Sequence, residues 1–197
     1  GKNTHPFRHN NVMLIHNGHI PAFDQVRPLL LERLNPNRRT AIVGDTDSEH
    51  MLALLLQLRN EAPDALLSTI TRRGIQLVQQ WCRQVDADID ASVSDQSFAD
   101  LEAVPEDVLH GTLALNILWA DGSVLAGARL NRMLWRVERA APHYCPICNT
   151  THTGASPEAY QATVLASERI TDEPWHAIPN GSVFQVNAQG AFHQDPL

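Results

Sequence analysis

The apolar residues of the chain recur with two different spacings. From about residue 24 to residue 85 the apolar residues recur at helical spacing, and elsewhere they form short runs bounded by turn residues. Helices placed between two sets of strands indicate an α+β fold, with an antiparallel sheet covered by helices. The predicted helices cover residues 24–34, 46–60 and 64–85, the last with a break at Gly74, and the predicted strands cover residues 12–15, 40–43, 112–119, 124–130, 134–137, 160–167 and 182–186.

Composition narrows the class of protein. A chain of 197 residues with 43% hydrophobic residues suits one domain, 1–197, with a sizeable core. Lys and Arg number 15 against 22 Asp and Glu, and no basic run exceeds two residues, so we expect no nucleic-acid partner. No apolar run approaches membrane-spanning length and no signal-peptide pattern is present, so we expect no membrane contact. Three cysteines, an odd number, do not suggest a disulfide framework and favour a cytoplasmic location.

The stretch "LIHNGHI" carries the first candidate site. Asn17-Gly18 directly follows the predicted strand 12–15, and on local grounds this dipeptide is the strongest short signal for a two-residue hairpin turn. The same two residues can also supply a side-chain amide and a closely approaching backbone N–H to a ligand. Both interpretations remain open at this point.

The stretch "GDTDSEH" carries the second candidate site. Thr46 and Glu49 have the spacing of a capping box, in which Thr46 caps the helix and Glu49 reaches back to it. Asp47 has no part in that box beyond a mild interaction with the helix dipole, on the order of 0.3–1 kcal/mol. A carboxylate at such a corner is well placed to bind a ligand ammonium group.

The stretch "HYCPICNTTH", residues 143–152, carries the third candidate site. Cys145 and Cys148 form a Cys-x-x-Cys pair, and His143 and His152 flank it. Thiolate and imidazole are the preferred ligands of a structural zinc ion, although the usual paired second half is absent. A loop without metal and a redox pair are the alternatives, and the thioredoxin-like βαβ context of a redox pair is missing.

Taken together, the motifs resemble a known family. The order "NTHPF", "HNGHI", "GDTDSE", then "LNILWADGSVLAGARL" and "VLASERITDEPWHAIPNGSVFQV", is similar to that of the class II glutamine amidotransferases. It looks closest to their small stand-alone branch, which includes the ergothioneine-pathway γ-glutamyl hydrolase. The match spans most of residues 3–187 and implies an N-terminal-nucleophile hydrolase fold, an αββα sandwich.

The resemblance implies a role for each site residue. The Asn17 amide and the Gly18 N–H would stabilise the oxyanion formed on the γ-carbonyl of glutamine or a γ-glutamyl compound. Asp47 would bind the substrate α-ammonium group. Thr46 and His16 complete the predicted substrate-binding set. His16 would be a neighbour that packs against or orients the turn. It would not be the catalytic base, because in this fold the α-amine of the nucleophile is the base. No cofactor is needed for this chemistry, and a zinc ion at residues 143–152 would only clamp a loop.

The sequence departs from the family at the nucleophile. The family's catalytic cysteine opens its chain, ahead of the segment that corresponds to "NTHPF", and none of Cys82, Cys145 and Cys148 occupies that place. We therefore expect that a segment upstream of Gly1, or a second polypeptide such as a synthase subunit, supplies the cysteine and the first strands. The alternative is an inactive scaffold or partner-binding subunit with a Cys/His zinc loop. Formation of a homo-oligomer is left open.

Overall fold

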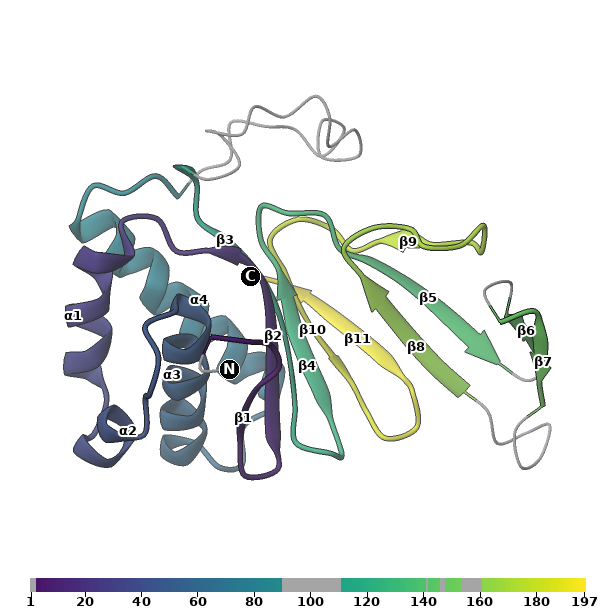
Figure 1. Ribbon diagram of the computed structural model, residues 1–197, viewed down its shortest axis with the longest axis horizontal. Helices are drawn as coiled ribbons and strands as arrows, with labels where there is room; N and C mark the ends of the chain where they lie inside the picture. Colours follow the sequence, from purple (N-terminus) through teal and green to yellow (C-terminus); the bar gives the residue numbers. More distant parts are fainter. Residues whose placement is uncertain (1–2, 90–110, 141, 146–147, 154–160) are drawn as a thin grey trace.

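In the computed structural model, a layer of helices lies against one face of a large antiparallel sheet, and a smaller sheet lies toward the other side (Figure 1). The structure describes residues 3–89, 111–140, 142–145, 148–153 and 161–197, without the side chains of His143 and His152. Four helices and the strands β1 and β2 come from the first 84 residues, and the remaining strands follow residue 113. Within this part of the chain the architecture is α+β, as predicted.

The helices are α1 (Phe23–Arg33), α2 (Pro36–Thr40), α3 (Asp47–Glu61) and α4 (Leu67–Gln84). The strands are β1 (Phe7–His9), β2 (Val12–His19), β3 (Ala114–Ala120), β4 (Leu125–Arg129), β5 (Trp135–Ala140), β6 (His143–Cys145), β7 (Thr150–His152), β8 (Gln161–Ala166), β9 (His176–Ala177), β10 (Ser182–Val186) and β11 (Phe192–Pro196).

The large sheet has the order β1-β2-β3-β4-β10-β11, with every neighbouring pair antiparallel. Alternate residues of β2 and β3 point into the helical layer, where Leu14 and Trp119 are fully buried. The indole N–H of Trp119 donates to Thr71 of α4 at 2.8 Å, which satisfies the polar atom of this large side chain. The main core therefore lies between the helices and one face of this sheet.

The smaller sheet has the order β8-β5-β9, and the hairpin β6–β7 is attached beyond it. A second hydrophobic cluster around Leu134, Ile178 and Phe184 joins this sheet to the outer face of the large one. The resemblance predicted a further helical layer covering the second sheet. Among the residues that the structure describes, helices cover the large sheet alone, so the arrangement seen there is helix–sheet–sheet (Figure 1).

Two local predictions are wrong. Residues 40–43 do not form a strand, because Thr40 is the last residue of the short helix α2, which Asn35 caps and Pro36 begins. Residues 41–43 lie in the loop between α2 and α3. The Asn35 side chain accepts a hydrogen bond from the Arg38 N–H at 2.9 Å, and proline is well tolerated at the first helical position. Thr40, Ile42 and Val43 are β-branched and favour a strand locally, but Thr40 belongs to the capped helix α2.

The predicted break at Gly74 is also absent, since α4 is continuous across it. Gly74 faces α3, and a Cβ atom there would lie 2.9 Å from Leu55 Cδ2 and 3.2 Å from Met51 Cε. The glycine thus allows close approach of the two helices instead of ending one. The predicted hairpin after residue 112 is confirmed as β3–β4.

Most of the acidic stretch 86–110 lies outside the described residues. In the described part of the chain, no helix combines the length and the apolar character needed to cross a bilayer.

Candidate active site

Asn17 and Gly18 lie inside β2, and the prediction of a hairpin turn at this dipeptide is wrong. The whole of β2 is paired with β3, so both residues have partners across the ladder. Gly18 has φ +149°, which side-chain-bearing residues rarely adopt, and a Cβ atom there would lie 2.0 Å from the Ala114 carbonyl oxygen. The glycine is therefore required by close contact between strands rather than by a turn.

Asp47 is the first residue of α3, at a helix start that the sequence predicted. Thr46 caps the helix by accepting a hydrogen bond from the Glu49 N–H at 3.3 Å. The second half of the predicted capping box differs, because the Glu49 carboxylate accepts from the N–H groups of Val43 and Gly44, at 2.9 and 2.6 Å. Glu49 therefore holds the loop that leads into the helix, and the position of Asp47 is fixed from both sides.

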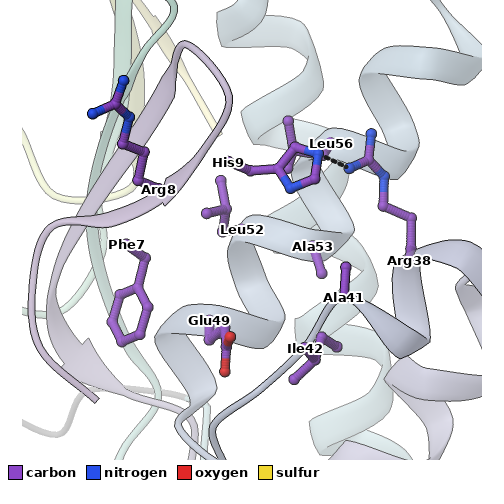
Figure 2. A pocket seen from close by; sticks show the side chains of 10 residues that line it. All are labelled: Phe7, Arg8, His9, Arg38, Ala41, Ile42, Glu49, Leu52, Ala53 and Leu56. Atoms are coloured by element: carbon purple, nitrogen blue, oxygen red, sulfur yellow. Dashed lines mark hydrogen bonds between the residues drawn. The ribbon is translucent and has the colours of Figure 1, made fainter. Parts of the chain in front are cut away.

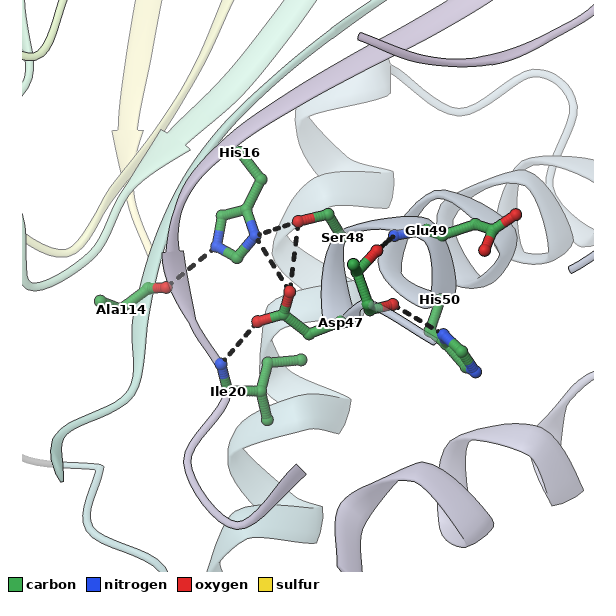
Figure 3. A network of polar contacts seen from close by, with 8 residues as sticks. His16, Ile20, Asp47, Ser48, Glu49, His50 and Ala114 are labelled. Carbon is green, nitrogen blue, oxygen red and sulfur yellow. Dashed lines mark hydrogen bonds and ion pairs between the residues drawn. The ribbon is translucent and has the colours of Figure 1, made fainter. Parts of the chain in front are cut away.

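The Asp47 carboxylate reaches the end of β2 (Figure 3). Its Oδ2 accepts a hydrogen bond from the Ile20 N–H at 2.9 Å, two residues beyond Gly18. Its Oδ1 lies 3.2 Å from the Ser48 hydroxyl and 3.9 Å from His16 Nδ1. The two motifs, 27 residues apart in the chain, thus meet at one point of the tertiary structure.

His16 is buried between β2, β3 and the start of α3, and both ring nitrogens have protein partners. Nε2 lies 3.1 Å from the Ala114 carbonyl oxygen, which can only accept, so Nε2 carries the proton. Nδ1 lies 3.0 Å from the Ser48 hydroxyl. Burial lowers the pKa of His16 below its ordinary value, against the opposing effect of the Asp47 carboxylate. The imidazole is therefore neutral at pH 7, and its Nδ1 can accept a hydrogen bond from the Ser48 hydroxyl.

Ser48 is a member of this network that the sequence analysis did not single out. Its one hydroxyl proton can serve either His16 Nδ1 or Asp47 Oδ1, so its orientation links the two groups. A buried serine in the first turn of a helix carries no recognisable signal in the sequence, because such residues are common near helix starts for capping alone.

Asn17 points to the opposite face of the sheet from His16, since side chains alternate along a strand. It lines a cavity of about 290 Å³ between β2, β3 and the end of β8, together with Asn116, Leu165 and Glu168. Within the described part of the chain the Asn17 carboxamide has no hydrogen-bond partner. This cavity is large enough for an amino-acid side chain.

A second cavity, between the β1–β2 hairpin and helices α2 and α3, is much smaller (Figure 2). Arg38 donates to His9 at its rim, at 3.0 Å, over an apolar floor that includes Leu52 and Leu56. Its volume of about 50 Å³ holds a few water molecules rather than an amino acid. We assign it no function.

The predicted Cys/His set occupies the hairpin β6–β7, which the register His143↔His152 and Cys145↔Thr150 defines. Among the side chains that the structure describes, no group of three or more His, Cys, Asp or Glu suits a metal ion. The structure thus brings Gly18, His16, Thr46 and Asp47 together where the end of β2 meets the start of α3, with Asn17 on the opposite face of β2. Cys145 and Cys148 lie in the hairpin β6–β7.

Comparison with known proteins places this arrangement in a class. The fold is similar to a class II glutamine amidotransferase domain protein from Silicibacter pomeroyi, with a TM-score of 0.57 and 20% identity over 98% of this chain and 70% of that one. It is also similar to a predicted glutamine amidotransferase from Pseudomonas aeruginosa, with a TM-score of 0.56 and 21% identity over 95% and 64% of the two chains. The protein therefore has the fold of the class II glutamine amidotransferases.

A comparison of sequences indicates the same class of protein as the comparison of folds. The chain is 25% identical, over 95% of its length, to the probable glutamine amidotransferase DUG3 of Saccharomyces cerevisiae, and it spans about half (53%) of that relative's length. No family model matches the chain. In sequence and in fold the protein is glutamine amidotransferase-like.

Proposed function

We propose that the protein acts in the hydrolysis of a γ-glutamyl amide, glutamine or a larger γ-glutamyl compound, by the glutamine amidotransferase mechanism. A cysteine thiolate attacks the γ-carbonyl carbon, the amine or ammonia leaves with a proton, and water then hydrolyses the γ-glutamyl thioester. The observation that carries the proposal is the hydrogen bond from Ile20 N–H to Asp47, which holds a carboxylate beside the strand end that bears Asn17 and Gly18. We also propose that the protein belongs to the small stand-alone branch of the class II glutamine amidotransferases.

Asn17 and Gly18 would stabilise the oxyanion of the tetrahedral intermediate. The Asn17 carboxamide lines an open cavity, so its N–H₂ group is available to a substrate oxygen. One such donor contributes roughly 2.7–4 kcal/mol of transition-state stabilisation when it is preorganised. A strand paired along its length is a rigid support for this purpose.

Asp47 would bind the substrate α-ammonium group. Its side chain is 17% exposed, and a carboxylate that already accepts one backbone N–H retains further lone pairs for a ligand. Thr46 and His16, expected to help bind the substrate, have their polar atoms occupied by protein groups. We therefore propose that both act by positioning Asp47 and β2.

The cysteine nucleophile would come from a segment upstream of Gly1. Cys82 is buried within α4, where burial raises its pKa to about 11, so it is a poor nucleophile. Met13 and Ile15, on the same face of β2 as Asn17, are 46% and 45% exposed. Because large apolar side chains on a sheet face are normally covered, we propose that the segment bearing the cysteine packs here, beside Asn17.

The same open face supports a second candidate function. An inactive subunit could bind a partner, such as a synthase subunit or a second copy of this chain, through Met13 and Ile15. A cytoplasmic location remains part of both proposals and rests on the cysteine content alone.

One labelling experiment separates the two. The native protein is treated with a glutamine analogue that carries a diazoketone in place of the amide, and the labelled peptide is identified by mass spectrometry. Labelling of a cysteine outside residues 1–197, blocked by glutamine, is the expected result. Labelling of Cys82, Cys145 or Cys148, or no labelling together with no ammonia release from glutamine, would contradict the hydrolase proposal and favour the inactive subunit.

A further inference from the structure

Ser48 lies between a titratable base and the carboxylate that is proposed to bind the substrate (Figure 3). Its hydroxyl oxygen is 3.0 Å from His16 Nδ1 and 3.2 Å from Asp47 Oδ1. His16 Nδ1 and Asp47 Oδ1 are themselves 3.9 Å apart. The proposed function uses the charge of Asp47, but it gives no role to the histidine that is joined to this charge through a hydroxyl group.

Of these three side chains, Asp47 is the one that solvent reaches most. The side chain of Asp47 is 17% exposed and that of His16 is 1% exposed, and Ser48 is buried. A ligand can therefore reach the carboxylate, whereas the imidazole lies behind it. Because little water separates the two groups, a charge on one acts strongly on the other.

The Ser48 hydroxyl has one proton, and the protonation of His16 decides which neighbour receives it. The Nε2 proton of His16 stays with the Ala114 carbonyl oxygen, which can only accept. In neutral His16, Nδ1 can accept the hydrogen bond from Ser48, which leaves Asp47 Oδ1 open to a ligand. In protonated His16, Nδ1–H donates to Ser48, and the Ser48 hydroxyl then donates to Asp47 Oδ1.

We propose that Ser48 is a positioning residue that makes substrate binding at Asp47 depend on the protonation of His16. In the proposed function, on which this inference rests, Asp47 binds the α-ammonium group of the substrate. Protonated His16 places a positive charge 3.9 Å from Asp47 Oδ1 and, through Ser48, a hydrogen bond on the same oxygen. It therefore competes with the ammonium group. The proton comes from solvent, and it returns there when substrate binds.

The surroundings of His16 favour its neutral form at pH 7. Burial lowers its pKa, the Asp47 carboxylate of α3 opposes this effect, and His5, which precedes β1, lowers the pKa further. From β3, the Ala114 carbonyl oxygen faces the ring. Substrate binding is therefore at full strength at neutral pH, and it weakens as the pH falls through the lowered pKa of His16, which lies below 6.5.

His50 is a second titratable group near Asp47, one turn further along α3. Its Nδ1 lies 2.7 Å from the Thr46 carbonyl oxygen and so carries the proton, and its Nε2 accepts a hydrogen bond from Arg27 at 3.1 Å. Burial lowers its pKa as well. A pH effect that comes from His50 persists when His16 is replaced, so the two histidines can be told apart.

Binding of L-glutamate, the product of amide hydrolysis, to the catalytically complete protein tests the inference by calorimetry. We expect Kd to rise by at least about threefold from about pH 7.5 to about pH 5 in the wild type, and by less than about 1.5-fold in His16→Gln. The titration of glutamate itself is the same in both proteins. His193→Gln, an exposed histidine on β11, is the control and should behave as the wild type. Circular dichroism at each pH verifies folding.

The reverse effect can be measured in the wild type. Because linkage is reciprocal, bound glutamate must lower the pKa of His16. Histidine ring resonances followed by NMR, with and without saturating glutamate, should contain one whose pKa falls by at least about 0.5. This resonance should be missing from His16→Gln.

Ser48 variants test the hydroxyl bridge. Ser48→Ala should reduce the pH effect on Kd, and Ser48→Thr, which keeps a hydroxyl group, should restore it. The full pH effect in Ser48→Ala, or an equal effect in the wild type and His16→Gln, would overturn this inference and leave the proposed function standing. No binding of glutamate at any pH would overturn both.

Discussion

The Asp47 carboxylate accepts a hydrogen bond from the main-chain N–H of Ile20 at 2.9 Å, and so joins the start of α3 to the end of β2. This contact makes Asp47 both a structural anchor and a candidate ligand for an ammonium group. The two roles can be separated, because the anchor needs only an oxygen acceptor whereas the ammonium group needs the charge.

We expect Asp47→Asn to raise KM for glutamine by about 10- to 100-fold and to leave the free energy of unfolding nearly unchanged. Asparagine keeps an oxygen for the Ile20 N–H, but it loses a charge-assisted interaction of roughly 1.5–3 kcal/mol with the substrate. Asp47→Ala should show the same KM effect and a lower unfolding free energy in addition. Asp45→Asn, on the same loop, is the control, and an unchanged KM in Asp47→Asn would remove the ammonium role.

We expect Asn17→Ala to reduce kcat by about 10²–10³-fold in the catalytically complete protein, with little change in stability. The substitution removes one proposed oxyanion donor, and the Asn17 side chain is exposed on a fully paired strand. Steady-state kinetics of ammonia release measure the effect. Asn11→Ala, at the other end of the same hairpin, should retain activity, and wild-type turnover in Asn17→Ala would exclude this residue from the mechanism.

We expect Gly18→Ala to lower the free energy of unfolding by more than about 3 kcal/mol. Backbone strain of about 1–3 kcal/mol at φ +149° adds to a contact of 2.0 Å between the new Cβ atom and the Ala114 carbonyl oxygen. Urea denaturation measures the change. Gly111→Ala, where an added Cβ meets nothing within 4 Å, is the matched control, and equal stabilities would contradict the strand geometry described for β2.

The buried His16 predicts an acid-dependent loss of stability. Its pKa is lower in the folded protein than the ordinary value of 6.5, chiefly because of burial, so the unfolded chain binds a proton first as the pH falls. The contribution of neutral His16 to stability is present above pH 6.5 and is lost from there down to the lowered native pKa, with a slope of at most about 1.4 kcal/mol per pH unit.

His16→Gln tests this dependence, since glutamine can still donate to the Ala114 carbonyl oxygen and does not titrate. The unfolding free energy of the wild type should fall more steeply below pH 6.5 than that of the variant. Parallel curves would show that His16 does not titrate between the two states. His50, whose pKa burial also lowers, is present in both proteins and does not affect the comparison.

The candidate site could be predicted from its residue types but not from its geometry. Thr46 and Asp47 were located correctly because a helix cap is a local device, in which one side chain meets a backbone group three residues away. Asn17 and Gly18 lie next to each other on β2, and the turn predicted for them is wrong. Their local preference for a turn was overridden by the pairing with β3, about 100 residues further along the chain.

By itself, the sequence determined where most helices and strands form, which short motifs carry polar chemistry, and that α3 begins at Asp47. Only the tertiary structure decided that Asp47 reaches Ile20, that Ser48 lies between His16 and Asp47, and that Asn17 points away from them into a separate cavity. The physical reason is that caps and periodicity depend on neighbours within a few residues. Strand register and buried hydrogen bonds depend instead on segments that are far apart in the chain, and no local sequence pattern indicates which of these segments will meet.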